Sequence, residues 1–176
     1  MALAVIYIDT IPKLRIDMPN TLVNNFIRQI NELENGSLWF DQSLRDKLEI
    51  TDSIAFEKPL PSVHSVAEHV SHMLEWRKEC ILRFRGEKKE LMHSPEDWKD
   101  NSQLKIIGWT RLKQDLFESS KSMIKLIEGK DDSYLDTMFQ DTAYTFKYLI
   151  EGIIHHDIYH LGQIGVVLKL LRSNDQ

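Results

Sequence analysis

Apolar residues recur along most of this chain at intervals of three and four positions, which is the spacing that places side chains on one face of an α-helix. Four segments keep this pattern over several turns, and we expect helices at about residues 20–34, 65–85, 109–128 and 142–171. Strand signals are weak, because only Val5–Ile8 forms a short apolar run and no alternating run of useful length follows it. Four long amphipathic helices predict an all-α four-helix bundle.

The residues between these helices predict where they begin and end. Ser65 followed by Glu68 has the spacing of a capping box, and Gly86 and Gly129 are suited to end helices. The connections Glu49–Pro61 and Lys88–Ile107 are longer than the about 2–8 residues usual in a simple up-and-down bundle. We therefore expect at least one crossover connection, or a lid over a site.

Length and composition indicate a single folded domain over residues 1–176, with an extra segment before the first helix. Lys and Arg number 22 against 27 Asp and Glu, a net charge of −5, so the chain lacks the basic face that a nucleic-acid partner requires. The apolar opening Ala2–Ile8 is too short for a membrane span and has no basic flank, so we expect neither a membrane anchor nor a signal peptide. Cys80 is the sole cysteine and cannot form an intrachain disulfide, which favours a cytoplasmic protein.

The candidate chemistry is concentrated in the fourth predicted helix. At about 100° per residue, His156 and His160 fall within the apolar arc of that helix, whereas His155 points the opposite way. Two imidazoles four residues apart on one helical face can reach a single metal ion, and a shared metal would offset the cost of burying them. The alternative is a pair of core histidines that form hydrogen bonds to their neighbours. Because both histidines lie on one turn and face inward, we favour metal binding.

Asp157 lies near the centre of the same apolar arc and needs a partner, because an unpaired buried carboxylate is costly. It is a candidate metal ligand, base, or acceptor behind a ligand histidine, and equally a structural residue bonded to a Tyr, a Trp or the backbone. The string His156-Asp157-Ile158-Tyr159-His160 also differs from the H-E-x-x-H protease motif by Asp in place of Glu, so a metalloprotease is disfavoured.

A third metal ligand must come from another helix, and the second predicted helix contains His69 and His72. Spacing alone favours His69, which lies inside the apolar arc. His72 lies on the border of the arc, where a site at the corner between two helices would lie. The choice stays open on these grounds, while His64 is expected to be a solvated residue near the start of the helix.

The string at His64–Arg77, H-S-V-A-E-x-x-x-H-x-x-x-W-R, is followed some 80 residues later by H-D-x-Y-H-x-G-Q-I from His156 to Ile164. These strings resemble the DinB/YfiT-like superfamily of metalloenzymes, and the resemblance covers most of the chain. It implies an up-down-down-up four-helix bundle in which His72, His156 and His160 bind a divalent metal, most often zinc or nickel. His69 departs from the family, where this position is usually apolar, so a fourth-ligand or supporting role is open.

The resemblance also implies a class of reaction. Characterised relatives include thiol transferases that use bacillithiol or mycothiol, and others are proposed hydrolases. We therefore expect an enzyme that transfers a low-molecular-weight thiol, as co-substrate, to a small electrophilic substrate; the alternatives are a metal-dependent hydrolase and a non-catalytic, metal-stabilised dimeric bundle. Relatives are often homodimers, and we expect one here.

Residues near the predicted ligands are candidates for supporting roles. They are Asp157, Gln163 and His69 as bases or outer hydrogen-bond partners, and Trp76 and Tyr159 as walls of a substrate pocket. Trp98, in the long connection, is expected at the pocket entrance. For Gln163 and Trp76, ordinary helix packing is the competing interpretation.

Overall fold

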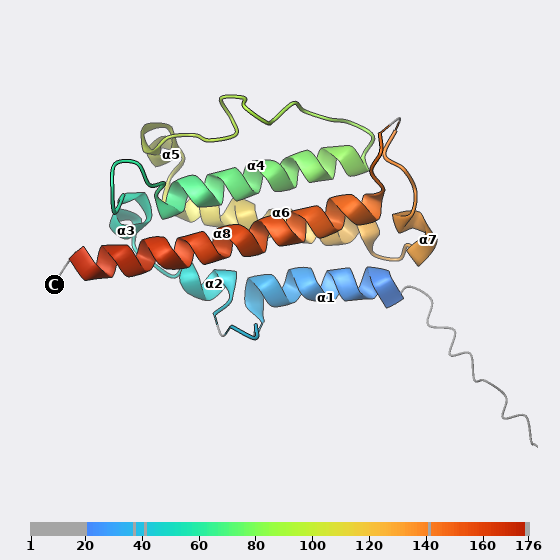
Figure 1. Ribbon diagram of the computed structural model, residues 1–176, viewed down its shortest axis with the longest axis horizontal. Helices are drawn as coiled ribbons and strands as arrows, with labels where there is room; N and C mark the ends of the chain where they lie inside the picture. The colour runs from blue at the N-terminus through green and yellow to red at the C-terminus, as the bar shows by residue number, and fades with distance from the viewer. Residues whose placement is uncertain (1–20, 37, 41, 141, 175–176) are drawn as a thin grey trace, which may run out of the picture.

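The computed structural model describes residues 21–36, 38–40, 42–140 and 142–174, and this part of the chain folds into α-helices without a strand. Four long helices, α1 (Thr21–Asn35), α4 (Val66–Phe84), α6 (Trp109–Ile127) and α8 (Phe146–Asn174), form a bundle (Figure 1). Four short helices lie in the connections: α2 (Leu44–Lys47), α3 (Asp52–Phe56), α5 (Asn101–Ile107) and α7 (Asp132–Leu135). The all-α prediction is confirmed, whereas the predicted N-terminal segment, with Val5–Ile8, lies outside the described residues.

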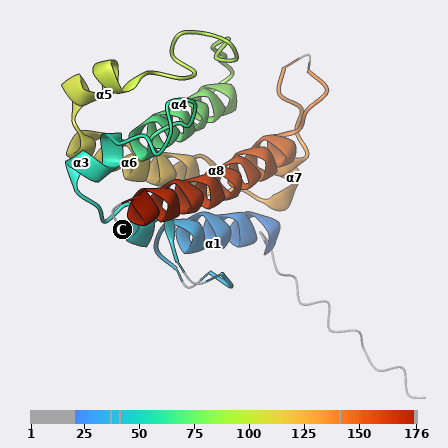
Figure 2. The same ribbon diagram turned by 60° about the vertical axis from the view of Figure 1, so that its left-hand side comes forward.

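The four long helices follow the up-down-down-up order that the resemblance implied. Helices α4 and α6 run in one direction, and α1 and α8 run in the other (Figures 1 and 2). Because α4 and α6 are parallel neighbours, the chain must return along the whole bundle between them. Residues 85–108 make this return along the outer side of α4 and form α5 on the way, so the predicted crossover is present (Figure 1).

Local sequence explains the helix ends. Ser65 Oγ accepts a hydrogen bond from the backbone N–H of Glu68, and the Glu68 carboxylate accepts one from the backbone N–H of Ser65. Gly86 and Gly129 follow α4 and α6 with φ of 81° and 73°. Helix α8 begins four residues later than predicted, because Thr137 and Thr145 border a turn in which the Phe146 N–H bonds the Thr137 carbonyl.

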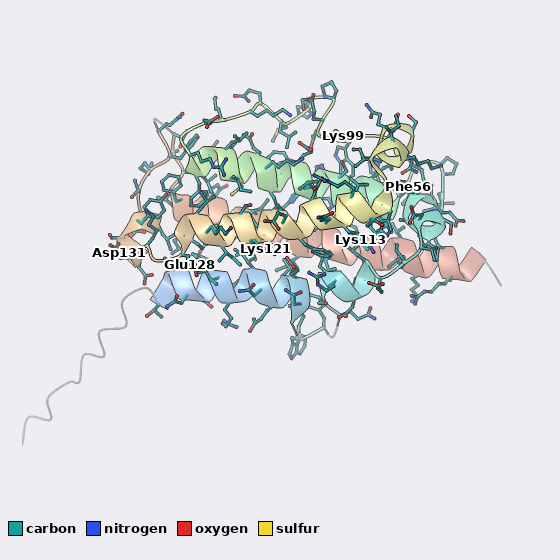
Figure 3. The ribbon with its side chains drawn as sticks, turned by 180° about the vertical axis from the view of Figure 1, so that it is seen from behind. Phe56, Lys99, Lys113, Lys121, Glu128 and Asp131 are labelled. Atoms are coloured by element: carbon teal, nitrogen blue, oxygen red, sulfur yellow. The ribbon has the colours of Figure 1, made fainter. Side chains whose placement is uncertain are left out.

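The core consists of two apolar clusters with a polar layer between them, which contains the buried residues Arg77, Ser119, Ser120 and Asp157. One cluster gathers residues such as Val70, Leu112 and Ile164, and the other gathers residues such as Phe84, Met123 and Ile150. Seen from behind, α6 lies in front of α8, with Lys113 and Lys121 along it (Figure 3). No helix in the described part of the chain is long and apolar enough to span a membrane.

Candidate metal centre

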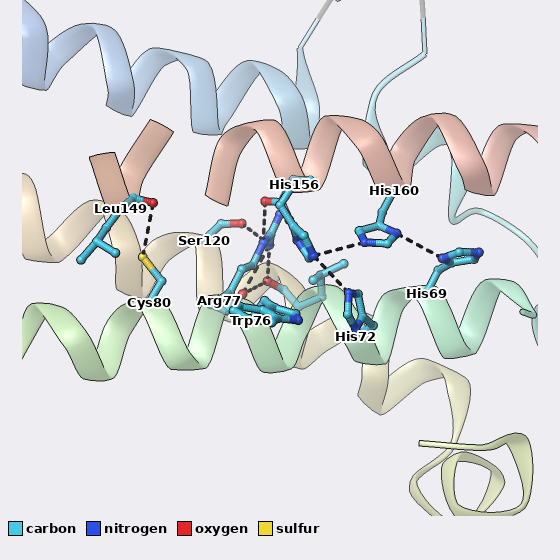
Figure 4. Close-up of polar contacts among 12 residues, drawn as sticks. His69, His72, Trp76, Arg77, Cys80, Ser120, Leu149, His156 and His160 are labelled. Carbon is cyan, nitrogen blue, oxygen red and sulfur yellow. Dashed lines mark hydrogen bonds and ion pairs between the residues drawn. The ribbon is translucent and has the colours of Figure 1, made fainter. Parts of the chain in front are cut away.

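Three histidines meet between α4 and α8 near the polar layer. His156 and His160 are one turn apart on α8, and His72 faces them from α4 (Figure 4). The Nε2 atom of His156 lies 3.1 Å from Nε2 of His72 and 3.1 Å from Nε2 of His160. Nitrogen ligands about 2.0–2.1 Å from a tetrahedral ion lie roughly 3.3 Å from one another, so the three atoms are spaced as ligands of one ion would be.

The hydrogen-bond partners of His72 Nδ1 determine which of the two ring nitrogens carries the hydrogen. His72 Nδ1 lies 2.9 Å from the backbone oxygen of Asp97 and 3.0 Å from the Asp97 carboxylate. Both partners are acceptors, so Nδ1 must be the donor and Nε2 presents its lone pair to the centre. Outer hydrogen bonds of this kind are typical of metal-binding histidines.

Burial keeps the three rings in the neutral form that binds metals. Burial, reinforced by the neighbouring histidines, lowers the pKa of His156 to about 3 and that of His160 to about 4. Burial also lowers the pKa of His72, although contacts with Asp97 oppose this effect. At neutral pH the centre therefore holds neutral imidazoles, each with one lone pair.

Hydrogen bonds among the three rings cannot satisfy all of these atoms. His72 Nε2 has no hydrogen, and a neutral His156 ring carries at most one hydrogen on Nε2. If that hydrogen points to His72, Nε2 of His156 has no lone pair left. A hydrogen on Nε2 of His160 would then have no acceptor in the contact with His156. If the His156 hydrogen points to His160 instead, the His72 lone pair has no donor; if Nε2 of His156 carries no hydrogen, His156 and His72 face each other lone pair to lone pair at 3.1 Å. A cation at the centre would satisfy all three nitrogens together, so the residues fit a metal ion.

His69, which spacing alone favoured as the α4 ligand, is placed outside this group. It is buried behind His160, with its Nδ1 3.3 Å from Nδ1 of His160. Helix α8 packs along the border of the α4 apolar arc, so the border residue His72 and not the central residue His69 faces the pair. Burial and the neighbouring His160 lower the pKa of His69 to about 3, so it is a neutral ring that can accept a hydrogen bond from His160.

Asp157 is paired with an arginine, a partner that the sequence did not suggest. Its Oδ2 accepts a hydrogen bond of 2.9 Å from Nε of Arg77, and both side chains are buried. Arg77 also donates to the Leu116 carbonyl and to the hydroxyls of Ser119 and Ser120. The pair therefore joins α4, α6 and α8 within the polar layer. The one feature of the sequence that could have indicated this pair is the position of Arg77 on a buried face of its helix.

The crossover connection, residues 85–108, covers the outer side of the histidine centre. Trp98 is stacked between His64 and His72, with ring centroids 3.9 Å from each. Trp76 donates a hydrogen bond from Nε1 to Oδ1 of Asp97, 2.9 Å away. Asp97 was not predicted, because a loop residue has no periodic signal. His64 is not simply solvated: besides the stacking, it bonds the Glu68 carboxylate.

A cavity of about 480 Å³ opens beside the three histidines, between α4 and α8. The predicted wall residues Trp76, Tyr159 and Trp98 all line it, whereas Gln163 lies outside it and donates to the Tyr159 hydroxyl. The complete lining is His72, Trp76, Glu79, Cys80, Arg83, Trp98, Tyr148, Leu149, Gly152, Ile153, His156, Tyr159 and His160. The volume lies in the range of about 300–1,000 Å³ typical of small-molecule sites.

Comparison with known families assigns the chain to a family. The family model described as the DinB superfamily matches residues 44–164, which include α4, α6, the crossover and all three histidines. The chain belongs to the DinB superfamily. Neither the search of curated proteins nor the search of solved structures gives a match. For this DinB protein, family membership and the histidine triad together fit a metal-dependent enzyme.

Proposed function

We propose that His72, His156 and His160 hold one divalent metal ion, zinc or nickel, and that the protein is a metal-dependent enzyme. The observation that carries this proposal is the meeting of three neutral Nε2 atoms, all within 4.8 Å of one another, which their own hydrogens cannot satisfy. Three protein ligands leave a coordination position for a reactant, as in catalytic zinc sites. When bound, the ion would lower the pKa of a thiol or a water and so produce a nucleophile at neutral pH.

We infer further that the nucleophile is a low-molecular-weight thiol and that the enzyme is an S-transferase. Glu79 is the sole carboxylate among the described residues that line the cavity, and it is bonded to Arg83 and to the backbone N–H of Lys89. A hydrolase that uses a carboxylate base would need a free carboxylate that faces the cavity. A thiol needs less help, because its ordinary pKa is about 8.5.

The chain itself cannot supply this thiol. Cys80 lines the cavity, but its side chain is buried, and its sulfur lies 4.0 Å from the Leu149 carbonyl (Figure 4). Burial, with a smaller effect of Asp157, raises the pKa of Cys80 to about 12. The nucleophile must therefore come from solution as a co-substrate. In the reaction the thiol loses its proton to solvent water, sulfur forms a bond to carbon of the electrophile, and the bond from that carbon to the leaving group breaks, so that the leaving group departs with its electron pair.

The chain's own residues would arrange this reaction. Asp97 holds the His72 ring from behind, and His69 accepts a hydrogen bond from His160, so two of the three rings are fixed in orientation. Trp98, stacked on His72, covers the centre on the side of the crossover and limits the access of water. Both effects reduce the reorganisation needed at the moment of reaction.

Metal analysis of untagged protein, purified without chelator, tests the first part of the proposal. We expect about one zinc or nickel ion per chain, lost in His156→Ala and retained in His155→Ala, whose exposed ring lies beside His156 on α8. Absence of stoichiometric metal after reconstitution with zinc or nickel would refute the metal centre.

An activity assay tests the second part. Zinc-loaded protein is incubated with cysteine and 1-chloro-2,4-dinitrobenzene, and the release of chloride with thioether formation is followed. We expect conjugation that His156→Ala abolishes and His155→Ala keeps. Hydrolysis of the electrophile without thioether would instead support the hydrolase, and a metal-loaded protein inert in both assays would favour the non-catalytic bundle.

A further inference from the structure

The cavity beside the histidine centre has an apolar surface although several of its residues are polar. Its walls include the side chains of Trp76, Tyr148, Leu149 and Ile153, and also the buried and neutral Cys80. Two of the remaining polar groups have partners within the protein. The Trp76 Nε1–H donates to Asp97, and the Tyr159 hydroxyl accepts from Gln163.

The two charged residues of the lining cancel each other. Oε1 of Glu79 accepts from Arg83 at 2.8 Å, and Oε2 accepts from the backbone N–H of Lys89 at 2.8 Å. The Glu79 side chain is 2 % exposed, so its carboxylate is closed off from a ligand, whereas Arg83 is 23 % exposed and already paired with Glu79. No other Lys, Arg, Asp or Glu is present in the described lining, so in the metal-free protein a cationic ligand would find no free carboxylate and an anionic ligand only this paired, partly exposed arginine.

We propose that this cavity is the electrophile subsite and that it takes neutral, planar aromatic molecules. The inference rests on the proposed function for its place in the reaction, because the electrophile must lie beside the histidines that would hold the metal ion. The aromatic electrophile lies along Trp76 with its reactive carbon towards the histidines. Binding here depends on burial of apolar area and on ring contacts.

Glycine at position 152 contributes to the size of this subsite. Gly152 lies in the cavity wall on α8, and a Cβ added there would meet no atom within 4 Å. A larger side chain can therefore enter the open space without a clash, and replacement of a glycine within a helix favours the helical state. Gly162 provides a matched control, since it is also exposed on α8 with no atom within 4 Å of an added Cβ, but lies outside the cavity.

Two fluorescent probes with the same ring system test the proposal. N-phenyl-1-naphthylamine is neutral, and 8-anilinonaphthalene-1-sulfonate adds one negative charge to the same skeleton. Each is titrated into the full-length protein, both metal-free and zinc-loaded. We expect saturable binding of one neutral probe per chain, at least about tenfold tighter than the sulfonate in the metal-free protein, and we expect zinc to leave binding of the neutral probe unchanged. Equal or tighter binding of the sulfonate would overturn the proposed ligand class.

The glycine variants locate the bound probe. Gly152→Leu should weaken binding of the neutral probe at least about tenfold, and Gly152→Ala should weaken it less, whereas Gly162→Leu should leave it unchanged. A melting curve on each variant verifies folding. Unchanged binding in a folded Gly152→Leu would refute the subsite. Because the metal-free protein is used, failure of this proposal is distinct from failure of the metal centre, which the metal content reports separately.

Discussion

The ion pair between Arg77 and Asp157 allows a quantitative test of how the bundle is held together beside the three histidines. Arg77→Met keeps most of the side-chain volume but removes every hydrogen bond of the guanidinium. The variant leaves a fully buried carboxylate without a countercharge. Removal of one partner from a buried pair typically costs about 3–5 kcal/mol of the free energy of unfolding. At about 2–4 °C per kcal/mol for a domain of this size, the melting temperature should fall by about 6–20 °C.

The loss should also depend on pH, with a sign that the burial of Asp157 determines. Burial raises the pKa of Asp157 to about 6, against the opposing effect of Arg77. Without Arg77, the pKa in the folded state rises further above its unfolded value. A carboxyl with a raised folded pKa loses stability as the pH rises through that pKa. The difference from wild type should therefore be small at pH 5.5, where the carboxyl of the variant is protonated, and larger at pH 8.

Urea denaturation followed by circular dichroism provides the measurement, with EDTA present so that metal binding does not vary with pH. The double variant Arg77→Met/Asp157→Leu serves as the control, because it removes both charges and should recover at least about 2 kcal/mol of the loss. A loss below about 1 kcal/mol at pH 8, a loss independent of pH, or a double variant as unstable as the sum of its single changes would refute this reasoning.

Three further substitutions test individual contacts. His69→Leu removes the acceptor behind His160 and should weaken zinc binding by about 10–100-fold, measured against a chromophoric chelator, with one ion per chain still bound. Asp97→Ala should weaken zinc less than His69→Leu in the same assay, because the Asp97 backbone carbonyl still accepts from His72. Gly108→Ala should cost about 1–3 kcal/mol in urea denaturation, since φ of 86° with ψ of 147° is strained for a residue with a Cβ.

Hydrophobic periodicity predicted the long helices well because apolar residues recur at helical spacing along each of them. Helices α1, α4 and α6 begin and end within a residue or two of their predicted limits. The short helices were missed, because four to seven residues cannot show a repeating stripe. The long connections predicted a crossover, and the family resemblance specified that α4 and α6 run parallel, since periodicity has no information about direction.

The candidate site was predictable to the extent that its residues lie on helical faces. His156 and His160 share a face by their spacing alone, and the structure brings them together. His72 could not be chosen over His69 in this way, because the choice depends on where α8 packs against α4. Their role as metal ligands stays a prediction. The pairing of Arg77 with Asp157, 80 residues apart, depends on tertiary packing that no local pattern contains.

The crossover links the topology of the bundle to its chemistry. A parallel α4 and α6 require a connection that returns along the bundle, and this connection passes the histidine centre on the way. At that point Asp97 holds the unligating nitrogen of His72, and Trp98 stacks on the same ring. The bundle itself supplies only the inward nitrogens, and the orientation of His72 comes from a loop that a simple up-and-down bundle would not contain. We therefore expect changes in the crossover to alter metal affinity through His72, while changes along the cavity wall of α8 alter the choice of substrate.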